Sequence, residues 1–186
     1  MSLNYDNLDW ADGAVNIPGI RPVVFFIRKT DILVWPTFAA APANDDEEVT
    51  YVGDFGLAVG KTFKRMSLLD EKSPVIFEPQ GEQSSRSFLN KATLKVPLSK
   101  KKATAFAKKA NNDDLVYLIQ EKMGEFRVVG NEMFRTNTSV TQALGGAPTE
   151  ERATTLEVSV TDAMPAPYYT GSIVTDDGDI NPPPAG

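Results

Sequence analysis

The chain has 186 residues, a formal net charge of −6, and neither cysteine nor histidine. The missing cysteines exclude disulfides, thiolate metal sites and a cysteine nucleophile, and the missing histidines exclude a Ser-His-Asp triad and histidine metal centres. The acidic balance argues against a protein that grips duplex DNA, because a basic face supplies most of that affinity. We therefore expect neither an enzyme nor a cofactor or metal.

The composition suits a folded domain, since 41% of the residues are hydrophobic and 24% are charged. No run of about 18 apolar residues is present, so we expect no membrane partner. Residues 1–13 lack the basic and apolar regions of a secretory signal, so we do not expect one.

The first strongly patterned region predicts a β-hairpin. Residues 23–27 and 32–35 are rich in β-branched and aromatic side chains, and Lys29-Thr30-Asp31 between them is typical of a turn. Trp35 lies in the second of these segments, so we expect it in the core.

An acidic run follows, made of Asp45, Asp46, Glu47 and Glu48. Four adjacent carboxylates could hold a divalent cation through oxygen ligands. The favoured interpretation is a solvated loop tip between strands, because consecutive like charges usually mark exposed segments.

The sequence Gly60-Lys61-Thr62 raises the question of a phosphate-binding loop. That motif needs a glycine five positions earlier, and Phe55 occupies this position. A proline also follows soon after, at Pro74, where the motif requires a helix. We therefore expect a strand bent at Gly60 and its neighbouring glycines rather than a nucleotide site.

The middle of the chain predicts a strand and then a helix. Phe88, Ala92, Leu94 and Val96 alternate with Lys91, Thr93 and Lys95, which is the pattern of a half-buried strand. Residues 99–110 carry an apolar stripe at Ala103, Phe106, Ala107 and Ala110, with Ser99 as the expected N-cap. The lysines of this segment are 100, 101, 102, 108 and 109. They are interpreted as the solvated face of an amphipathic helix rather than a nucleic-acid patch.

The last third predicts further strands. Residues 115–119 and 126–129 should pair as a hairpin, and residues 155–160 alternate as a strand after a loop containing "LGG". We expect an antiparallel β-sandwich or barrel with one flanking helix. It should occupy residues 1–175 with an extended N-terminal segment, and an acidic, proline-rich tail over residues 176–186 should be flexible.

From Ser73 onward the order of these features resembles that of phage-type tail tube proteins, the major tail protein family. The similar parts are "EPQGEQSSRSFLNKATLKVP", helix "KKKATAFAKKANND", hairpin "DLVYLIQEKMGEFRVVGN", the "LGG" loop, strand "TTLEVSVT" and "PAPYYTG". The hairpin end Val129-Gly130-Asn131 and the closing Pro165-Ala166-Pro167-Tyr168-Tyr169 carry most of the likeness. None of these parts is a catalytic signature.

The resemblance implies a small β-sandwich that assembles with copies of itself into rings, typically hexameric, whose sheets join into one barrel. The rings stack into a tail tube in the virion, assembled in the host cytoplasm beside other tail proteins, and DNA passes through the lumen without specific binding. A net charge of −6 agrees with a lumen that repels phosphate.

Two alternatives remain open. The chain could be another ring-forming virion part, such as a tail terminator or head–tail joining protein, or a carbohydrate- or peptide-binding β-sandwich that uses Trp10 and Trp35. For the tube, the expected subunit contacts join the acidic run Asp45, Asp46, Glu47 and Glu48 to lysines of a neighbour. The lysines are Lys100, Lys101 and Lys102, with Lys108 and Lys109 behind them.

Overall fold

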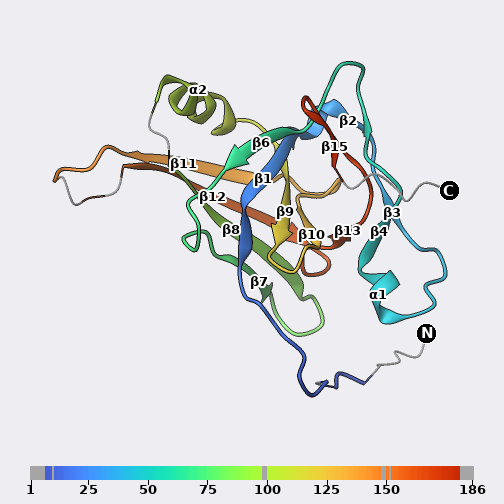
Figure 1. Cartoon of the computed structure of the whole chain (residues 1–186). Helices are drawn as coiled ribbons and strands as arrows, with labels where there is room; N and C mark the ends of the chain where they lie inside the picture. Colours follow the sequence, from blue (N-terminus) through green and yellow to red (C-terminus); the bar gives the residue numbers. More distant parts are fainter. Residues whose placement is uncertain (1–6, 10, 98–99, 148–149, 151, 181–186) are drawn as a thin grey trace.

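The computed structural model describes residues 7–9, 11–97, 100–147, 150 and 152–180 (Figure 1). It confirms the predicted class, because the chain is mainly β, its sheets are largely antiparallel, and α2 (Lys101–Ala110) is the main helix. The sheets form a sandwich-like arrangement and do not close into a barrel.

Two sheets form the body. In spatial order the larger one contains β3 (Thr37–Phe38), β4 (Thr50–Val52), β13 (Tyr168–Tyr169), β10 (Phe126–Val129), β9 (Leu115–Glu121), β1 (Ile20–Arg28) and β6 (Lys64–Ser67). The four-stranded sheet contains β11 (Asn137–Ala143), β12 (Ala153–Asp162), β8 (Ser87–Val96) and β7 (Val75–Gln80). Within these two sheets the neighbours β13 and β4 are parallel and the other pairs are antiparallel.

Two smaller sheets and two short helices complete the described fold. The smaller sheets pair β2 (Ile32–Val34) with β5 (Gly56–Leu57), and β14 (Ile173–Thr175) with β15 (Gly178–Ile180). The short helices are the 3-10 turn η1 (Lys29–Asp31) and α1 (Asp45–Glu48).

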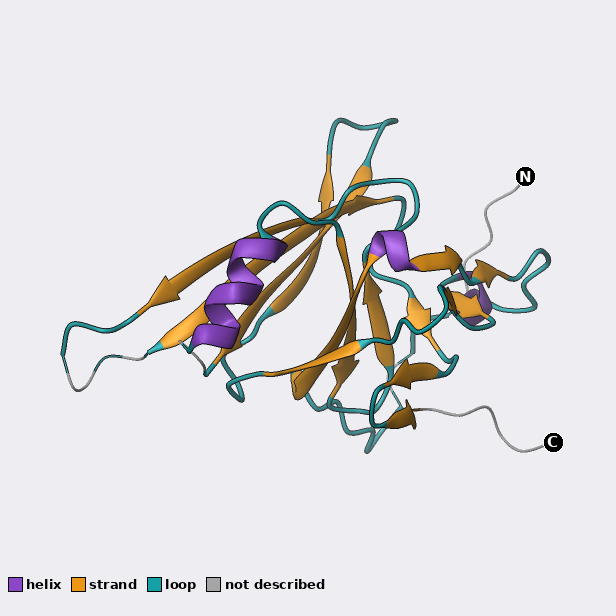
Figure 2. Ribbon diagram, turned by 90° about the horizontal axis from the view of Figure 1, so that it is seen from above, coloured by secondary structure: helices purple, strands orange, loops and turns teal. Residues whose placement is uncertain are grey.

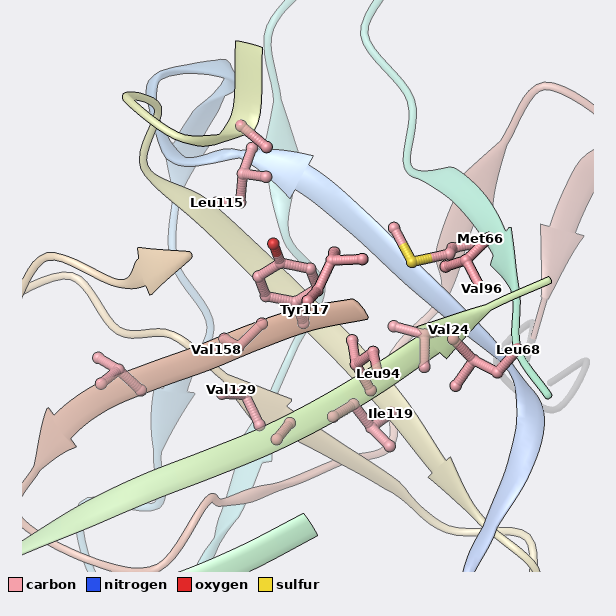
Figure 3. Close-up of a cluster of buried hydrophobic side chains, with 14 of the residues drawn as sticks. Val24, Met66, Leu68, Leu94, Val96, Leu115, Tyr117, Ile119, Val129 and Val158 are labelled. Carbon is pink, nitrogen blue, oxygen red and sulfur yellow. The ribbon is translucent and has the colours of Figure 1, made fainter. Parts of the chain in front are cut away.

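The core between the two large sheets, here called the inter-sheet core, explains why they pack together (Figure 3). Alternation on β8 turns Ala92, Leu94 and Val96 inward, as predicted, and the register places Leu156 of β12 opposite Leu94. The inter-sheet core includes Val24, Leu94, Val96, Leu115, Tyr117, Ile119, Val129, Leu156, Val158 and Val160.

The larger sheet is buried on both faces. Residues Leu115 to Ile119 of β9 are all buried, which requires apolar contacts on either side of the strand. A second core lies on the face away from the four-stranded sheet, and it includes Phe25, Phe55, Phe63, Leu118, Phe126, Tyr169 and Ile173. The small sheets β2–β5 and β14–β15 contribute Ile32 and Ile173 to it, so the molecule has three layers.

The predicted hairpin of residues 23–27 and 32–35 is wrong. The strand β1 pairs with β6 and β9, whereas β2 leaves the sheet after η1 and pairs with β5. Contacts distant in sequence therefore override the local turn signal, since β9, whose first five residues are all buried, is the better partner for a strand buried on both faces.

Three other segments have a conformation that differs from the prediction. The acidic loop is a helical turn, α1, and residues 178–180 of the expected flexible tail form β15, while 181–186 lie outside the described residues. Gly60 is not in a bent strand but in a turn with a φ of +74°, where the Lys61 N–H donates to the Ala58 carbonyl (2.9 Å).

The strand β11 was not predicted at all. Its inward positions include Thr138 and Gln142, so it lacks the apolar alternation that marked β8 and β12. The helix prediction is confirmed, with Lys100 as the N-cap and Asn111 as the C-cap, and the proposed cap Ser99 lies outside the described residues.

Candidate assembly surfaces

The acidic run is held as one exposed helical turn. The Asn44 side chain caps it by accepting a hydrogen bond from the Glu47 N–H (3.0 Å), and the Thr50 hydroxyl donates to the Asp46 carbonyl (2.6 Å). The Glu47 carboxylate accepts from the Ala43 N–H (2.9 Å). Asp45, Asp46, Glu47 and Glu48 are all exposed, so this turn presents four carboxylates at the surface.

The turn α1 lies beside the β9–β10 connection, at the lower right of Figure 1. A groove of about 480 Å³ joins the two elements, and its lining includes Asp46, Thr50, Gly124, Glu125 and Tyr168. This end of the molecule, called the acidic end, therefore presents Glu125 beside the four carboxylates of α1.

The helix α2 caps the opposite end of the inter-sheet core. Ala103 and Ala110 are buried, and the Phe106 ring meets the Phe26 ring of β1 edge-on, with centroids 5.2 Å apart. The predicted apolar stripe therefore packs inward, and its polar edge contacts the four-stranded sheet through Thr104, whose hydroxyl donates to the Gln142 side chain (3.2 Å).

The lysines of α2 face outward. Lys100, Lys101, Lys102, Lys108 and Lys109 are exposed, and none of them makes an ion pair with another residue in the described part of the chain. This end, called the basic end, adjoins Arg28 and Lys29 at the end of β1.

The acidic and basic ends are separated along the strands. The β1–β9 register pairs Arg28 with Leu115 at the basic end and Ile20 with Glu121 at the other. Since β9 has seven residues and a strand rises about 3.4 Å per residue, the two ends lie roughly 20 Å apart along the sheet. The structure therefore does not bring the predicted acidic and lysine residues together within one chain.

The four-stranded sheet presents a face rich in hydroxyl groups on the side away from the core. Register and alternation turn these groups to the same side: Ser87, Thr93, Ser139, Thr141, Thr155, Ser159 and Thr161. Among the charged residues of this face, Lys91 and Lys95 are balanced by Glu78 and Glu157, and Lys91 pairs with Glu78. This surface, called the hydroxyl face, is close to neutral.

The sequence revealed only part of the hydroxyl face. Thr93 on β8 and Thr155 on β12 belong to separate alternating patterns, and only the register places these strands side by side. The contribution of β11, including Ser139, had no hydrophobic alternation to reveal it.

The four-stranded sheet has two unpaired edges in the described structure, β11 and β7. Pro79 of β7 has no N–H to offer a further strand, which blunts that edge, whereas β11 contains no proline. The hairpin of β11 and β12 extends beyond the rest of the sandwich, at the left of Figure 2.

Trp35 packs edge-on against Phe55, with ring centroids 5.5 Å apart, and it is half-buried at the border of the second core. This agrees with the expected core role, and Trp10 lies outside the described residues.

Burial raises the pKa of Tyr51 and of Tyr169 to about 12, so neither phenol ionises near neutral pH.

The described residues contain no group of three or more His, Cys, Asp or Glu side chains arranged to hold a metal ion. No helix in the described part of the chain is long and apolar enough to cross a membrane. Gly60-Lys61-Thr62 leads into the strand β6 rather than a helix, so it lacks the architecture of a phosphate-binding loop.

Comparisons with protein-family models, with curated proteins and with solved structures give no match for this chain.

Proposed function

We propose that this chain is a structural subunit that assembles with copies of itself into stacked rings, forming a phage-type tail tube through which DNA passes. The observation that carries the proposal is the separation of charge between the acidic end at α1 and the basic end at α2. A head-to-tail contact between two copies brings unlike charges together. Repetition of such a contact builds an open stack when the rotation between copies does not close into a ring, whereas a two-fold contact stops at a dimer.

The hydroxyl face supports the same function. A conduit for a polyanion needs a hydrated surface without excess positive charge, since clustered Lys and Arg would bind phosphates. We assign this face, with residues such as Thr93, Thr155 and Ser159, to the lumen. DNA would then pass without specific binding.

The tube proposal includes hexameric rings, other tail proteins as partners, a place in the virion and assembly in the host cytoplasm. These features rest on the resemblance from Ser73 onward. A tail terminator or head–tail joining ring would use the same kind of subunit but would stop at a single closed ring. The remaining alternative is a carbohydrate- or peptide-binding sandwich, and the packing of Trp35 against Phe55 weakens it.

Sedimentation velocity across protein concentration and salt tests the proposal. We expect species much larger than one ring, growing with concentration and shrinking as salt screens the charged ends. A monomer at all concentrations would contradict self-assembly. One discrete oligomer that does not grow would favour the terminator or joining ring.

A further inference from the structure

The basic end contains a groove whose chemistry differs from that of the exposed lysines around it. The groove has a volume of about 340 Å³ and lies between the end of β1, the Gly60 turn and the C-terminal half of α2. Phe26, Phe106 and Leu115 provide its apolar surface. Because this volume holds only one or two side chains, the groove suits the tip of a protruding segment rather than a broad partner surface.

The rim of the groove carries more positive than negative charge. Its cations are Arg28, Lys61, Lys64 and Lys109, and its carboxylates are Asp31 and Asp113. These residues are partly paired, with Arg28 to Asp113 at 2.6 Å, Lys61 to Asp31 at 3.5 Å, and Lys64 to Asp176 at 2.6 Å.

Lys109 is the rim cation that remains for a partner. It is exposed and makes no ion pair in the described part of the chain. A negatively charged segment that also carries an apolar side chain therefore matches both the charge of the rim and the apolar surface of the groove.

We infer that the groove binds the α1 segment of a second copy of this chain, residues 44–49. The segment is a single protruding turn with four exposed carboxylates, followed by half-buried Val49. Its own chain cannot supply this contact, since α1 lies beside the β9–β10 turn and the groove lies at the other end of the same strands.

This inference rests on the proposed head-to-tail stacking and adds the receptor site. It selects the C-terminal half of α2, near Lys109, over the N-terminal lysines Lys100, Lys101 and Lys102. The exposed ion pairs would be weak individually, so the apolar surface formed by Phe26, Phe106 and Leu115 is needed to hold the segment in one position.

Disulfide trapping tests the contact, because the chain has no cysteine of its own. Glu48→Cys and Lys109→Cys are prepared separately, mixed in equal amounts and oxidised, and the linked dimer is measured on a non-reducing gel. The matched control is Lys101→Cys, which is also exposed and lies about 12 Å away along the helix. Because a disulfide requires Cα atoms within about 7 Å, the two positions should differ clearly.

We expect dimer from Glu48→Cys with Lys109→Cys, little with Lys101→Cys, and less in high salt. Preferential linkage to Lys101→Cys would overturn the groove assignment. If the unmodified chain forms tubes but Lys109→Cys does not link, the inference is wrong and the tube stands. Linkage without tubes would support the contact and contradict the tube, and the absence of both would overturn both. Wild-type melting temperatures for the variants exclude misfolding as a cause.

Discussion

The hydroxyl groups of Tyr117 and Thr138 lie 2.9 Å apart in a hydrogen bond that joins the two large sheets through the inter-sheet core. Tyr117 belongs to β9 and Thr138 to β11, and both are buried. The Tyr117 side chain is visible in the core in Figure 3. Since β11 offers few apolar side chains to the core, this bond helps to hold an edge strand that hydrophobic burial alone holds weakly.

Tyr117→Phe and Thr138→Val should each lower the free energy of unfolding by about 1–2 kcal/mol. Each variant removes one hydroxyl group and leaves the other buried without its hydrogen-bond partner. The double variant should lose less than the sum, since neither unpaired hydroxyl remains. Urea unfolding of the four proteins measures this cycle. Additive losses would mean that the two groups do not interact.

Phe106→Ala should lower the free energy of unfolding by about 2 kcal/mol. A fully buried phenylalanine would cost about 3–5 kcal/mol, and Phe106 is only half-buried against Phe26. Lys108→Ala on the exposed side of the same helix is the control, with an expected change within about 0.5 kcal/mol. Equal losses in the two variants would contradict the packing of α2 on the core.

The fold was predictable where periodicity was strong. β8 and β12 alternate apolar and polar residues, and the β9–β10 hairpin combines apolar segments with a turn at Gly124, so their existence follows from the sequence. β11 could not be found in this way because Thr138 and Gln142 occupy inward positions. The strand that pairs with β1 could not be predicted either. β1 and β9 are far apart in sequence, and no local pattern indicates that they pair.

The candidate site was predictable only as separate pieces. The charges of α1 and α2 are evident from composition, but their position at opposite ends depends on the β1–β9 register. The groove near Lys109 combines residues from β1, the Gly60 turn and α2, which lie far apart in sequence. No motif could have brought them together.

Asp176→Asn should loosen the β14–β15 hairpin. The Asp176 carboxylate accepts hydrogen bonds from Lys64 Nζ (2.6 Å) and the Thr62 hydroxyl (2.5 Å), and these bonds, that of Lys64 first, lower the pKa of Asp176 below its usual 3.8. The ion pair therefore stabilises the folded state at pH values above the pKa of Asp176 in the unfolded chain. This stabilisation is lost as the pH falls through the lower pKa that Asp176 has in the folded state.

Amide hydrogen exchange checks this prediction at neutral pH and in acid. Residues 173–180 should exchange faster in Asp176→Asn at neutral pH, while β9 keeps its protection. In strong acid the wild type should approach the variant. An unchanged exchange rate in the hairpin would show that Phe63 and Ile173 hold it without the ion pair.

Neutralising the acidic turn as D45N/D46N/E47Q/E48Q should slow or misalign assembly. The four carboxylates should orient one subunit against the basic end of the next. Because they are exposed, the melting temperature of the single chain should change little. Light scattering during assembly, at low and high salt, measures the effect. A wild-type rate with wild-type salt dependence would indicate that α1 is only a solvated turn.

Negative-stain electron microscopy of the purified chain, at rising concentration in low salt, is the decisive test of tube assembly. We expect open hollow tubes of constant diameter and variable length, built of stacked rings, which shorten in high salt as the charged ends are screened. Single closed rings that never stack, or particles the size of one chain at every concentration, would contradict it.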